Sequence, residues 1–212
     1  MSDDELHQVA AGPRVAAARP LVDRLLGLAA PGATVSVEIT VMTTSDAIPR
    51  YRDLAPTNHE LHIPAEHLAA YLAVLDPLIQ DPVRRWPELG VDDGAGGRWL
   101  SVHGTEPDAV AAVATLPPVP VNITAEDLSR FDWSLLPTER DHPTGAAVEW
   151  RLGWPAVADL GPHYKHAAVC LFVNSVGSWD LEPGEPGYLL YISTETGGAR
   201  RAEHLATAAG LT

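Results

Sequence analysis

The sequence predicts an α+β fold, in which helices pack on a mixed or largely antiparallel sheet. Three observations support it. Ala33–Thr43 alternates apolar and polar residues, as a half-buried strand does. Between Leu68 and Ile79, apolar residues recur at spacings of four and three, which is typical of an amphipathic helix. Near the C-terminus, three strand-like segments are separated by thirteen-residue connections, which favours an antiparallel meander followed by a terminal helix.

The first part of the chain is expected to form two helices and a strand. Asp3–Ala11 is interpreted as a short helix that stops before a Gly-Pro pair. Val15–Leu28 carries one apolar stripe and predicts a second helix. Pro20 lies inside this run, so the helix is expected to kink or to restart there. The alternating strand Ala33–Thr43 follows.

The middle of the chain is predicted to alternate strands and helices. The backbone is expected to be extended up to Ile63, because a proline biases the residue before it away from helix. Pro64 suits the first position of the next helix, and Asp76-Pro77 is expected to start a separate last turn. The further elements expected here are a strand at Arg98–His103, a helix at Asp108–Thr115, a strand at Val119–Ile123 and a short helix from Thr124 to about Phe131.

The C-terminal part is predicted to hold the meander and the last helix. The strands are expected at Ala146–Leu152, His166–Val173 and Gly187–Ser193, and the helix at Gly198–Ala209. No internal repeat or low-complexity linker interrupts the chain. We therefore predict one α+β domain over residues 1–212, with a possible subdomain seam near residue 143.

Composition limits the classes of function. The formal net charge of -14 repels nucleic acid and anionic membrane surfaces, so neither is expected as a partner. No apolar run is long enough to span a bilayer. The acidic N-terminus lacks an apolar signal core, and a single cysteine fits a reducing compartment, so a cytoplasmic protein is expected. Thirteen arginines against one lysine indicate a GC-rich bacterial coding bias.

The segment from Asn58 to His67 concentrates titratable residues. On an extended strand Glu60 and His62 share a face, while His59 falls on the opposite one. His67 comes one helical turn later, beside Glu66. Glu60, His62, Glu66 and His67 are therefore candidate ligands for Zn²⁺ or another divalent metal. The same groups can instead serve as a metal-free acid–base pair, or simply form a polar strand edge.

A second candidate site is the run that contains His163, Lys165 and His166, just before an apolar strand. A strand terminus commonly displays functional groups. Lys165 can act as a Schiff-base amine or as a cation for a carboxylate if burial depresses its pKa. A site at His62 and His67 needs a further partner, and we expect His163 or His166 to supply it. The alternative is a solvated turn.

Three other features have a structural and a functional interpretation. Cys170 lies in an apolar run that favours packing over nucleophilic chemistry. The glycine-containing segment Ser193–Arg201 favours helix capping over anion binding, since its spacing fits no phosphate loop. Trp150, Trp154 and Trp179 can line a ligand pocket or close the core, and we favour the core.

Two main hypotheses on function follow. The first is a cytoplasmic enzyme that acts on a small-molecule substrate through a histidine and carboxylate site, either metal-dependent or acid–base. The second is a non-catalytic acidic interaction protein, such as an inhibitor or an immunity-type partner of a basic protein. A small-molecule-binding module that uses the tryptophans is a third possibility. No motif specifies a substrate, a reaction or an oligomeric state.

Overall fold

The computed structural model describes residues 5–33, 35–42, 58–63, 66–79, 88–91, 98–103, 120–125, 131, 133–142, 144–163, 168–179, 181–194 and 198–211, with the strands between 58 and 125 described by their backbone alone. The chain forms two compact units. The first consists of Met1–Glu38 and Glu126–Thr212, and the second of Ile39–Ala125. The second unit is therefore inserted into the sequence of the first.

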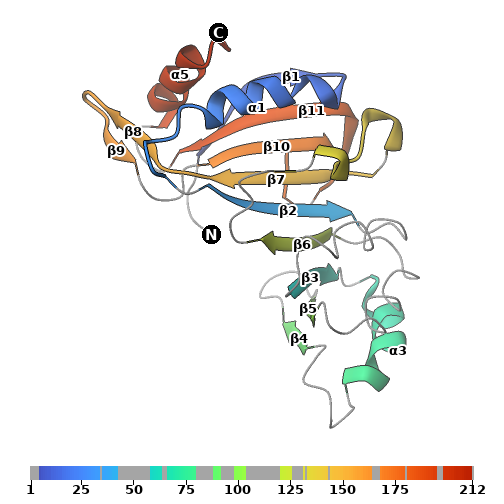
Figure 1. Cartoon of the computed structure of the whole chain (residues 1–212). Helices are drawn as coiled ribbons and strands as arrows, with labels where there is room; N and C mark the ends of the chain where they lie inside the picture. The colour runs from blue at the N-terminus through green and yellow to red at the C-terminus, as the bar shows by residue number, and fades with distance from the viewer. Residues whose placement is uncertain are drawn as a thin grey trace. The chain divides into compact units, whose positions relative to one another are not determined.

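The first unit is built on a largely antiparallel sheet whose strands follow the order β1-β11-β10-β7-β2 (Figure 1). Their bounds are Glu5–Gly12 for β1, Ser36–Met42 for β2, Ala146–Arg151 for β7, Ala168–Ser175 for β10 and Pro183–Thr194 for β11. β7, β10 and β11 pair antiparallel in sequence order, which confirms the predicted meander. β2 begins in this unit and ends in the second. The predicted α+β class is confirmed.

Two helices pack on one face of this sheet. A 3-10 turn at Val15–Ala17 leads into α1, Arg19–Leu26, which has Pro20 in its first turn and so restarts where the sequence predicts. The terminal helix α5, Gly198–Ala208, contacts β1 and β11. Arg24 Nη1 of α1 donates to the carbonyl of Gly210, just past α5, at 3.2 Å. This bond places the two helices side by side.

The core lies between these helices and the sheet. Directly paired residues of an antiparallel sheet share a face, and faces alternate along each strand. On the helix side the sheet positions are apolar and fully buried: Val37, Val148, Trp150, Val169, Leu171, Leu190 and Ile192. Val22 and Leu25 of α1 and Leu205 of α5 are buried with them. Burial of this apolar surface is the main stabilising contribution to the first unit.

The prediction of an N-terminal helix at Asp3–Ala11 is wrong. Glu5–Gly12 is the edge strand β1, which pairs antiparallel with β11 and bulges between Gln8 and Ala10. Local propensity is a weak determinant where tertiary pairing is possible. Here the exposed edge of β11 offers backbone donors and acceptors along seven residue pairs, from Glu5↔Thr194 to Gly12↔Tyr188. The tertiary hydrogen bonds prevail over the helical tendency.

Short elements occupy the connections of the first unit. The thirteen-residue connection Gly153–Lys165 contains a small hairpin of β8, Trp154–Val157, and β9, Gly161–His163. Two 3-10 turns, Trp133–Leu135 and Glu139–Asp141, precede β7. Phe131 packs edge-on against Trp133 and Trp150, and these two indoles stack at a centroid separation of 5.9 Å.

The second unit holds a four-stranded antiparallel sheet in the order β6-β3-β5-β4. Its elements are β3 Asn58–Ile63, α3 Leu68–Ile79, β4 Glu88–Val91, β5 Arg98–His103 and β6 Pro120–Ala125.

The strands predicted at the positions of β3, β5 and β6 are confirmed, and β4 was not expected. α3 continues through Pro77, so the separate last turn expected at Asp76-Pro77 is wrong. The helix expected at Asp108–Thr115 lies outside the described residues. Of the short helix expected from Thr124 to Phe131, the first residues belong to β6, and most of the rest lies outside the described residues.

The limits of the two units fall between Glu38 and Ile39 and between Ala125 and Glu126. A single domain over 1–212 with a seam near residue 143 stays a prediction. Among the helices that the structure describes, none combines the length and the apolar character that a membrane crossing requires.

Candidate functional site

The structure places Glu60 and His62 on β3 at alternate positions, so they share a face of the sheet, as the sequence predicts. Glu66 is exposed and His67 is half-buried, in the turn just before α3. The carbonyl of His67 accepts from the amides of Ala70 and Tyr71 at 3.1 and 3.2 Å, so His67 begins the helical hydrogen bonding. The backbone at positions 64 and 65 lies outside the described residues.

The proposed partners of this site belong to the first unit. His163 is the last residue of β9 and pairs with Trp154. Lys165 and His166 lie outside the described residues. Among the residues that the structure describes, no group of three or more histidine, cysteine or acidic residues can hold a metal ion. The suggested set of Glu60, His62, Glu66 and His67 stays a prediction.

The strand register of the second unit reveals more residues on the face of Glu60 and His62. Glu60 pairs with Ser101 on β5 and with Asn122 on β6, and Ser101 pairs with Glu88 on β4. These positions form one row across all four strands. Neighbouring rows on the same face pair Asn58 with His103 and His62 with Trp99. We call these positions the polar face: Asn58, Glu60, His62, Glu88, Trp99, Ser101, His103 and Asn122.

The opposite face of the same sheet is mostly apolar. His59 pairs with Val102 and Ile123, and Leu61 pairs with Leu100 and Val121. His59 is thereby separated from Glu60 and His62, as the strand alternation predicts. A sheet with one apolar and one polar face normally buries the first and leaves the second for solvent or ligand. The titratable residues of β3 and β5 therefore belong to the face that suits binding, with His59 as the exception.

Sequence reasoning missed Glu88 and His103 as members of this face. His103 ends a strand that was predicted with the observed bounds, and it is two residues from Ser101. The strand alternation alone places it with Ser101. Only the register, however, places Ser101 between Glu60 and Glu88. Paired positions have Cβ atoms about 4.5–5.5 Å apart, and diagonal positions about 7–8 Å. Glu60, Ser101 and Glu88 therefore occupy neighbouring positions of one row of the sheet.

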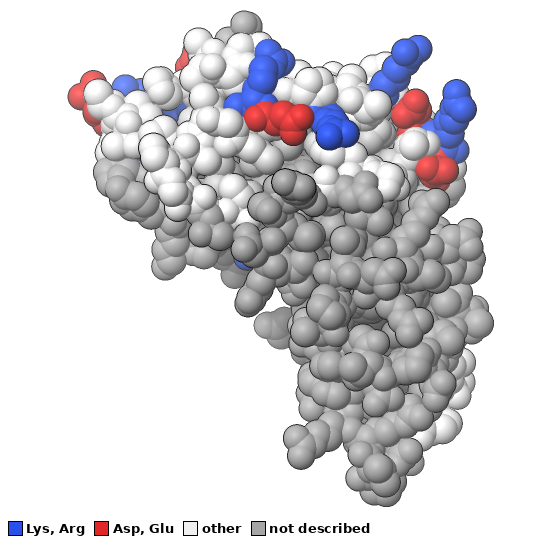
Figure 2. Space-filling view, viewed as in Figure 1, with Lys and Arg blue, Asp and Glu red and all other residues white. Residues whose placement is uncertain are grey.

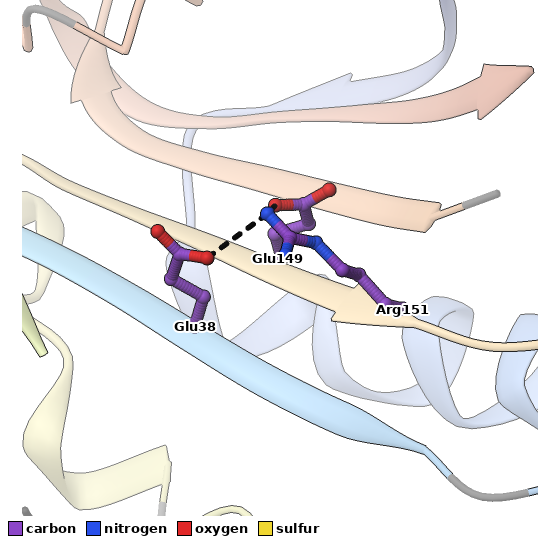
Figure 3. A network of polar contacts seen from close by, with 3 residues as sticks. All are labelled: Glu38, Glu149 and Arg151. Atoms are coloured by element: carbon purple, nitrogen blue, oxygen red, sulfur yellow. Dashed lines mark hydrogen bonds and ion pairs between the residues drawn. The ribbon is translucent and has the colours of Figure 1, made fainter. Parts of the chain in front are cut away.

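The first unit carries an ion-pair network on the face of its sheet that points away from α1 (Figure 3). Arg151 Nη2 lies 2.8 Å from Glu149 Oε2 and 3.0 Å from Glu38 Oε2. The hydrogen bond that Arg151 donates to Glu149 raises the pKa of the Arg151 guanidinium. Because the arginine neutralises both carboxylates, this network suits a structural role better than proton transfer.

The tryptophans divide between core and surface. Trp150 and Trp154 are 1% and 0% exposed, so they close the core, as favoured from the sequence. Trp179 remains 39% exposed on the connection between β10 and β11. Its ring lies edge-on against Phe172 at 5.0 Å, and Phe172 in turn contacts Tyr191. A tryptophan that is held by other rings and still open to solvent is a typical contact residue.

Two other sequence candidates have structural roles. Cys170 is buried in β10, which agrees with the packing interpretation. The glycine-containing segment leads into α5, and its last residue, Arg201, lies in the first turn of that helix and is fully buried. Its Nη2 donates to the carbonyls of Leu160 and Gly161 at 2.6 and 3.0 Å, and burial lowers the pKa of its guanidinium. Arg201 thus fastens α5 to the β8–β9 hairpin instead of binding an anion.

The charged side chains that Figure 2 shows on the first unit alternate in sign, with arginines beside carboxylates. That view contains no continuous acidic patch among the described residues. The polar face of the second unit and the exposed Trp179 therefore remain the two candidate sites. The chain matches no protein-family model, no curated protein and no solved structure.

Proposed function

We propose that the protein is an enzyme that acts on a small molecule through the histidines and carboxylates on the polar face of its second unit. The observation that carries this proposal is the register that puts Glu60 and His62 on one face with Ser101, His103 and Glu88. In this proposal the enzyme works in a reducing bacterial cytoplasm, which suits the single buried thiol of Cys170.

The chemistry follows from the residue types. Alternate positions on a strand are about 6.6–6.8 Å apart, so Glu60 and His62 can approach the same substrate. An imidazole exchanges protons near neutral pH, and a nearby carboxylate stabilises its charged form. His62 is the proposed proton-transfer group and Glu60 its partner, in an acid–base or metal-assisted reaction. His67, at the start of α3, is the next candidate, and His163, Lys165 and His166 are retained as proposed catalytic residues.

Untargeted turnover of a metabolite mixture tests this proposal. Purified protein is incubated with the mixture, and depleted and newly formed masses are recorded by mass spectrometry. We expect at least one substrate–product pair with the wild-type protein. His62→Ala and Glu60→Gln should lose this turnover with an unchanged thermal melting curve, since their positions lie on the polar face.

His59→Ala is the matched control, because it removes the same side chain from the same strand on the opposite face. It is expected to retain turnover. If His62→Ala and Glu60→Gln turn over the same metabolite as fast as the wild type, or if no metabolite is converted, the enzyme proposal fails.

The exposed aromatic surface of the first unit favours a second candidate function, binding of a basic protein. Val176 and Trp179 are 52% and 39% exposed, and they are the large hydrophobic residues that the described part of the chain exposes most. Glu182 and Glu185 are exposed a few residues further along the chain. Tryptophan is enriched at interface hot spots, and acidic neighbours steer a basic partner.

This second candidate predicts a specific dependence on Trp179 and on salt. Proteins captured by the immobilised chain are identified and purified, and their association rates are measured at low and high ionic strength. A basic partner should bind faster at low salt, and Trp179→Ala should lower its affinity about tenfold or more. A partner whose affinity is the same for Trp179→Ala and the wild type would argue against this surface.

A further inference from the structure

We infer that the connection between β10 and β11 binds an arginine side chain of a partner, with the guanidinium on the ring of Trp179 and the carboxylates of Glu182 and Glu185 beside it. The inference rests on the second candidate function, the binding of a basic protein, and names the chemical group that this surface recognises. The residues that carry it belong to the first unit, where the structure describes their side chains.

The connection exposes apolar surface that the strands around it bury. Val176 and Trp179, the large hydrophobic residues that the described part of the chain exposes most, both lie in this one segment. Phe172, on which the indole of Trp179 packs, is fully buried, so part of the indole is covered while 39% of the residue stays open to solvent. An aromatic residue held in this way is a typical anchor for a partner.

The charge of the same connection is entirely negative. Asn174–Pro186 contains three acidic residues, Asp180, Glu182 and Glu185, and no lysine, arginine or histidine. Glu182 and Glu185 are exposed, and within the part of the chain that the structure describes neither side chain takes part in an ion pair or a hydrogen bond. Carboxylates without an internal cation, next to an exposed ring, favour a cation supplied by a partner.

Backbone hydrogen bonds close the connection around Trp179. The amide of Val176 donates to the carbonyl of Glu182 at 3.1 Å, and the amide of Leu181 donates to the carbonyl of Ser178 at 3.1 Å. Trp179 and Glu182 are three residues apart, so their Cα atoms are at most about 11 Å from each other. A ligand that covers this turn therefore lies near both residues.

Glu185 lies next to the base of the same turn. Ser175 at the end of β10 pairs with Pro183 at the start of β11. Gly184 packs so closely on this end of β10 that a Cβ added to it would collide with the backbone of Ser175 and Val176. The residue that follows Gly184 is Glu185, so both exposed carboxylates belong to the segment that closes the turn.

The connection is held in one conformation before any partner binds. Asn174, Gly177 and Leu181 have positive φ values of 52°, 86° and 52°. Leucine rarely adopts this conformation, and here the burial of its side chain, which is 2% exposed, offsets the strain. A Cβ on Gly177 would lie 2.8 Å from the hydroxyl of Tyr191, so the connection packs directly on β11. A preorganised surface loses little conformational freedom on binding.

Arginine is the cation that fits these observations. Its guanidinium is planar, stacks on aromatic rings and is less strongly hydrated than an ammonium. Tryptophan attracts cations more strongly than the other aromatic residues do. A guanidinium also has several N–H donors, so it can pair with a carboxylate while it lies on the ring. Lysine meets the charge requirement but lacks the planar stacking, so we expect it to bind more weakly.

Binding of defined peptides to the full chain tests the inference. The probe is an end-blocked, unstructured peptide in which arginine alternates with serine, and its matched controls carry lysine or neutral citrulline instead of arginine. NMR follows the indole N–H signal of Trp179, which is assigned as the signal that Trp179→Phe lacks. The arginine peptide should shift this signal, and the citrulline peptide should bind at least about tenfold more weakly.

Calorimetry gives the affinities of the variants for the arginine peptide. Trp179→Ala should weaken binding at least about tenfold, and Trp179→Phe, which keeps a ring, should weaken it less. Glu182→Gln combined with Glu185→Gln should weaken binding about fivefold and reduce its dependence on salt. Glu203→Gln is the matched control, because it removes an exposed carboxylate from α5, and it should stay within about twofold of the wild type.

Thermal melting of each variant serves as the folding control, and Trp179→Phe with the double glutamine variant decides the matter if Trp179→Ala does not fold. The inference is overturned if the folded wild type does not bind the arginine peptide, or binds the citrulline peptide equally well. It is also overturned if Trp179→Ala, or the double glutamine variant, binds the arginine peptide as tightly as the wild type.

The peptide experiment separates failure of the arginine site from failure of the basic-protein candidate. If a basic protein binds with the expected dependence on Trp179 but the arginine peptide does not bind, the arginine site is rejected and the candidate function stands. If the arginine peptide binds as expected but no basic protein depends on Trp179, the arginine site stands and the candidate function is rejected.

Discussion

Arg151 and Glu38 join neighbouring strands of the first unit, with 3.0 Å between Arg151 Nη2 and Glu38 Oε2. Glu149 shares the same guanidinium nitrogen at 2.8 Å. Arg151→Ala leaves two carboxylates side by side without a cation. Because the arginine side chain is 52% exposed, solvent screens the effect, and we expect a loss of about 1 kcal/mol in the free energy of unfolding.

Chemical denaturation at low and high salt measures this loss, which should shrink as salt is added. Arg19→Ala is the matched control. Its pair with Asp23 is longer, at 3.9 Å, and both side chains are more than 60% exposed. It should cost no more than about 0.3 kcal/mol. Equal losses in the free energy of unfolding for the two variants would show that the ion pair between the strands stabilises the protein no more than the exposed pair on α1.

Asn174 is expected to be one of the most sensitive residues of the first unit. Its Nδ2 donates to the carbonyls of Thr138 and Thr144, at 2.9 and 3.0 Å, and its Oδ1 accepts from the amide of Gly187 at 3.0 Å. The residue is 1% exposed and has a positive φ of 52°. Asn174→Ala should cost about 3 kcal/mol or more, because three backbone groups, among them the buried amide of Gly187, lose their partner.

Asn174→Gly separates the two causes. It loses the same hydrogen bonds but tolerates the positive φ, so it should be about 1 kcal/mol more stable than the alanine variant. Equilibrium unfolding of both variants gives the comparison. Losses below about 1 kcal/mol for both would contradict the role assigned to this side chain.

Gly187 is predicted to tolerate no side chain. Its φ is 138°, and a Cβ built there collides with the carbonyl oxygen of Gly12, on the paired strand β1. Gly187→Ala should cost about 3 kcal/mol or more, since it adds backbone strain to a steric clash. Gly32→Ala is the control, because Gly32 also has a positive φ but no atom within 4 Å of the added Cβ. Its cost should be near 1 kcal/mol, and similar melting temperatures for the two variants would refute the clash.

Arg201 is predicted to stabilise the β8–β9 hairpin and to slow hydrogen exchange in it. Arg201→Met removes the bonds to the carbonyls of Leu160 and Gly161 and should cost about 2–3 kcal/mol, as hydrogen bonds from a charged donor do. Hydrogen exchange should accelerate in residues 154–163. Arg200→Met changes the exposed neighbouring arginine and is expected to alter neither stability nor exchange. Unchanged hairpin exchange in Arg201→Met would exclude the fastening role.

Glu139 is expected to make stability depend on acid pH. Hydrogen bonds from its own backbone amide and from that of Val15, at 3.3 Å, hold the pKa of its carboxyl below the ordinary value of 4.5. A lowered pKa adds stability above the unfolded-state pKa, and this contribution disappears as the pH falls through the folded-state pKa. Between about pH 5 and pH 3, the wild type should therefore lose more stability than Glu139→Gln. Parallel pH profiles for the two proteins would contradict this.

Sequence reasoning succeeded where the signal is local. The residues of each element alone predict the strands β7 and β10 and the helix α5. Each of the three lies close to its expected bounds. The strand β1 carries no comparable signal. Its conformation depends on pairing with β11, which lies at the other end of the sequence. Such tertiary pairing overrides local propensity and cannot be inferred from a short window.

The candidate site shows the same limit. Strand alternation correctly places Glu60 with His62 and separates them from His59. It does not determine which residue of β5 lies beside Glu60, because a shift of one residue exchanges the two faces of a strand. Glu88 and His103 therefore became candidates only through the register of β4 and β5. Lys165 and His166 lie outside the described residues and remain predictions.

The pairing of β1 with β11 has a consequence for synthesis on the ribosome. β1 is made early, but β7, β10 and β11 follow only after the whole second unit has been translated. The second unit can thus fold while the first still lacks most of its sheet. Contacts between distant parts of a chain also form slowly, since loop closure must precede them. The strand β1 therefore has no β11 to pair with until translation is nearly complete, and until then its backbone donors and acceptors can pair with other strands.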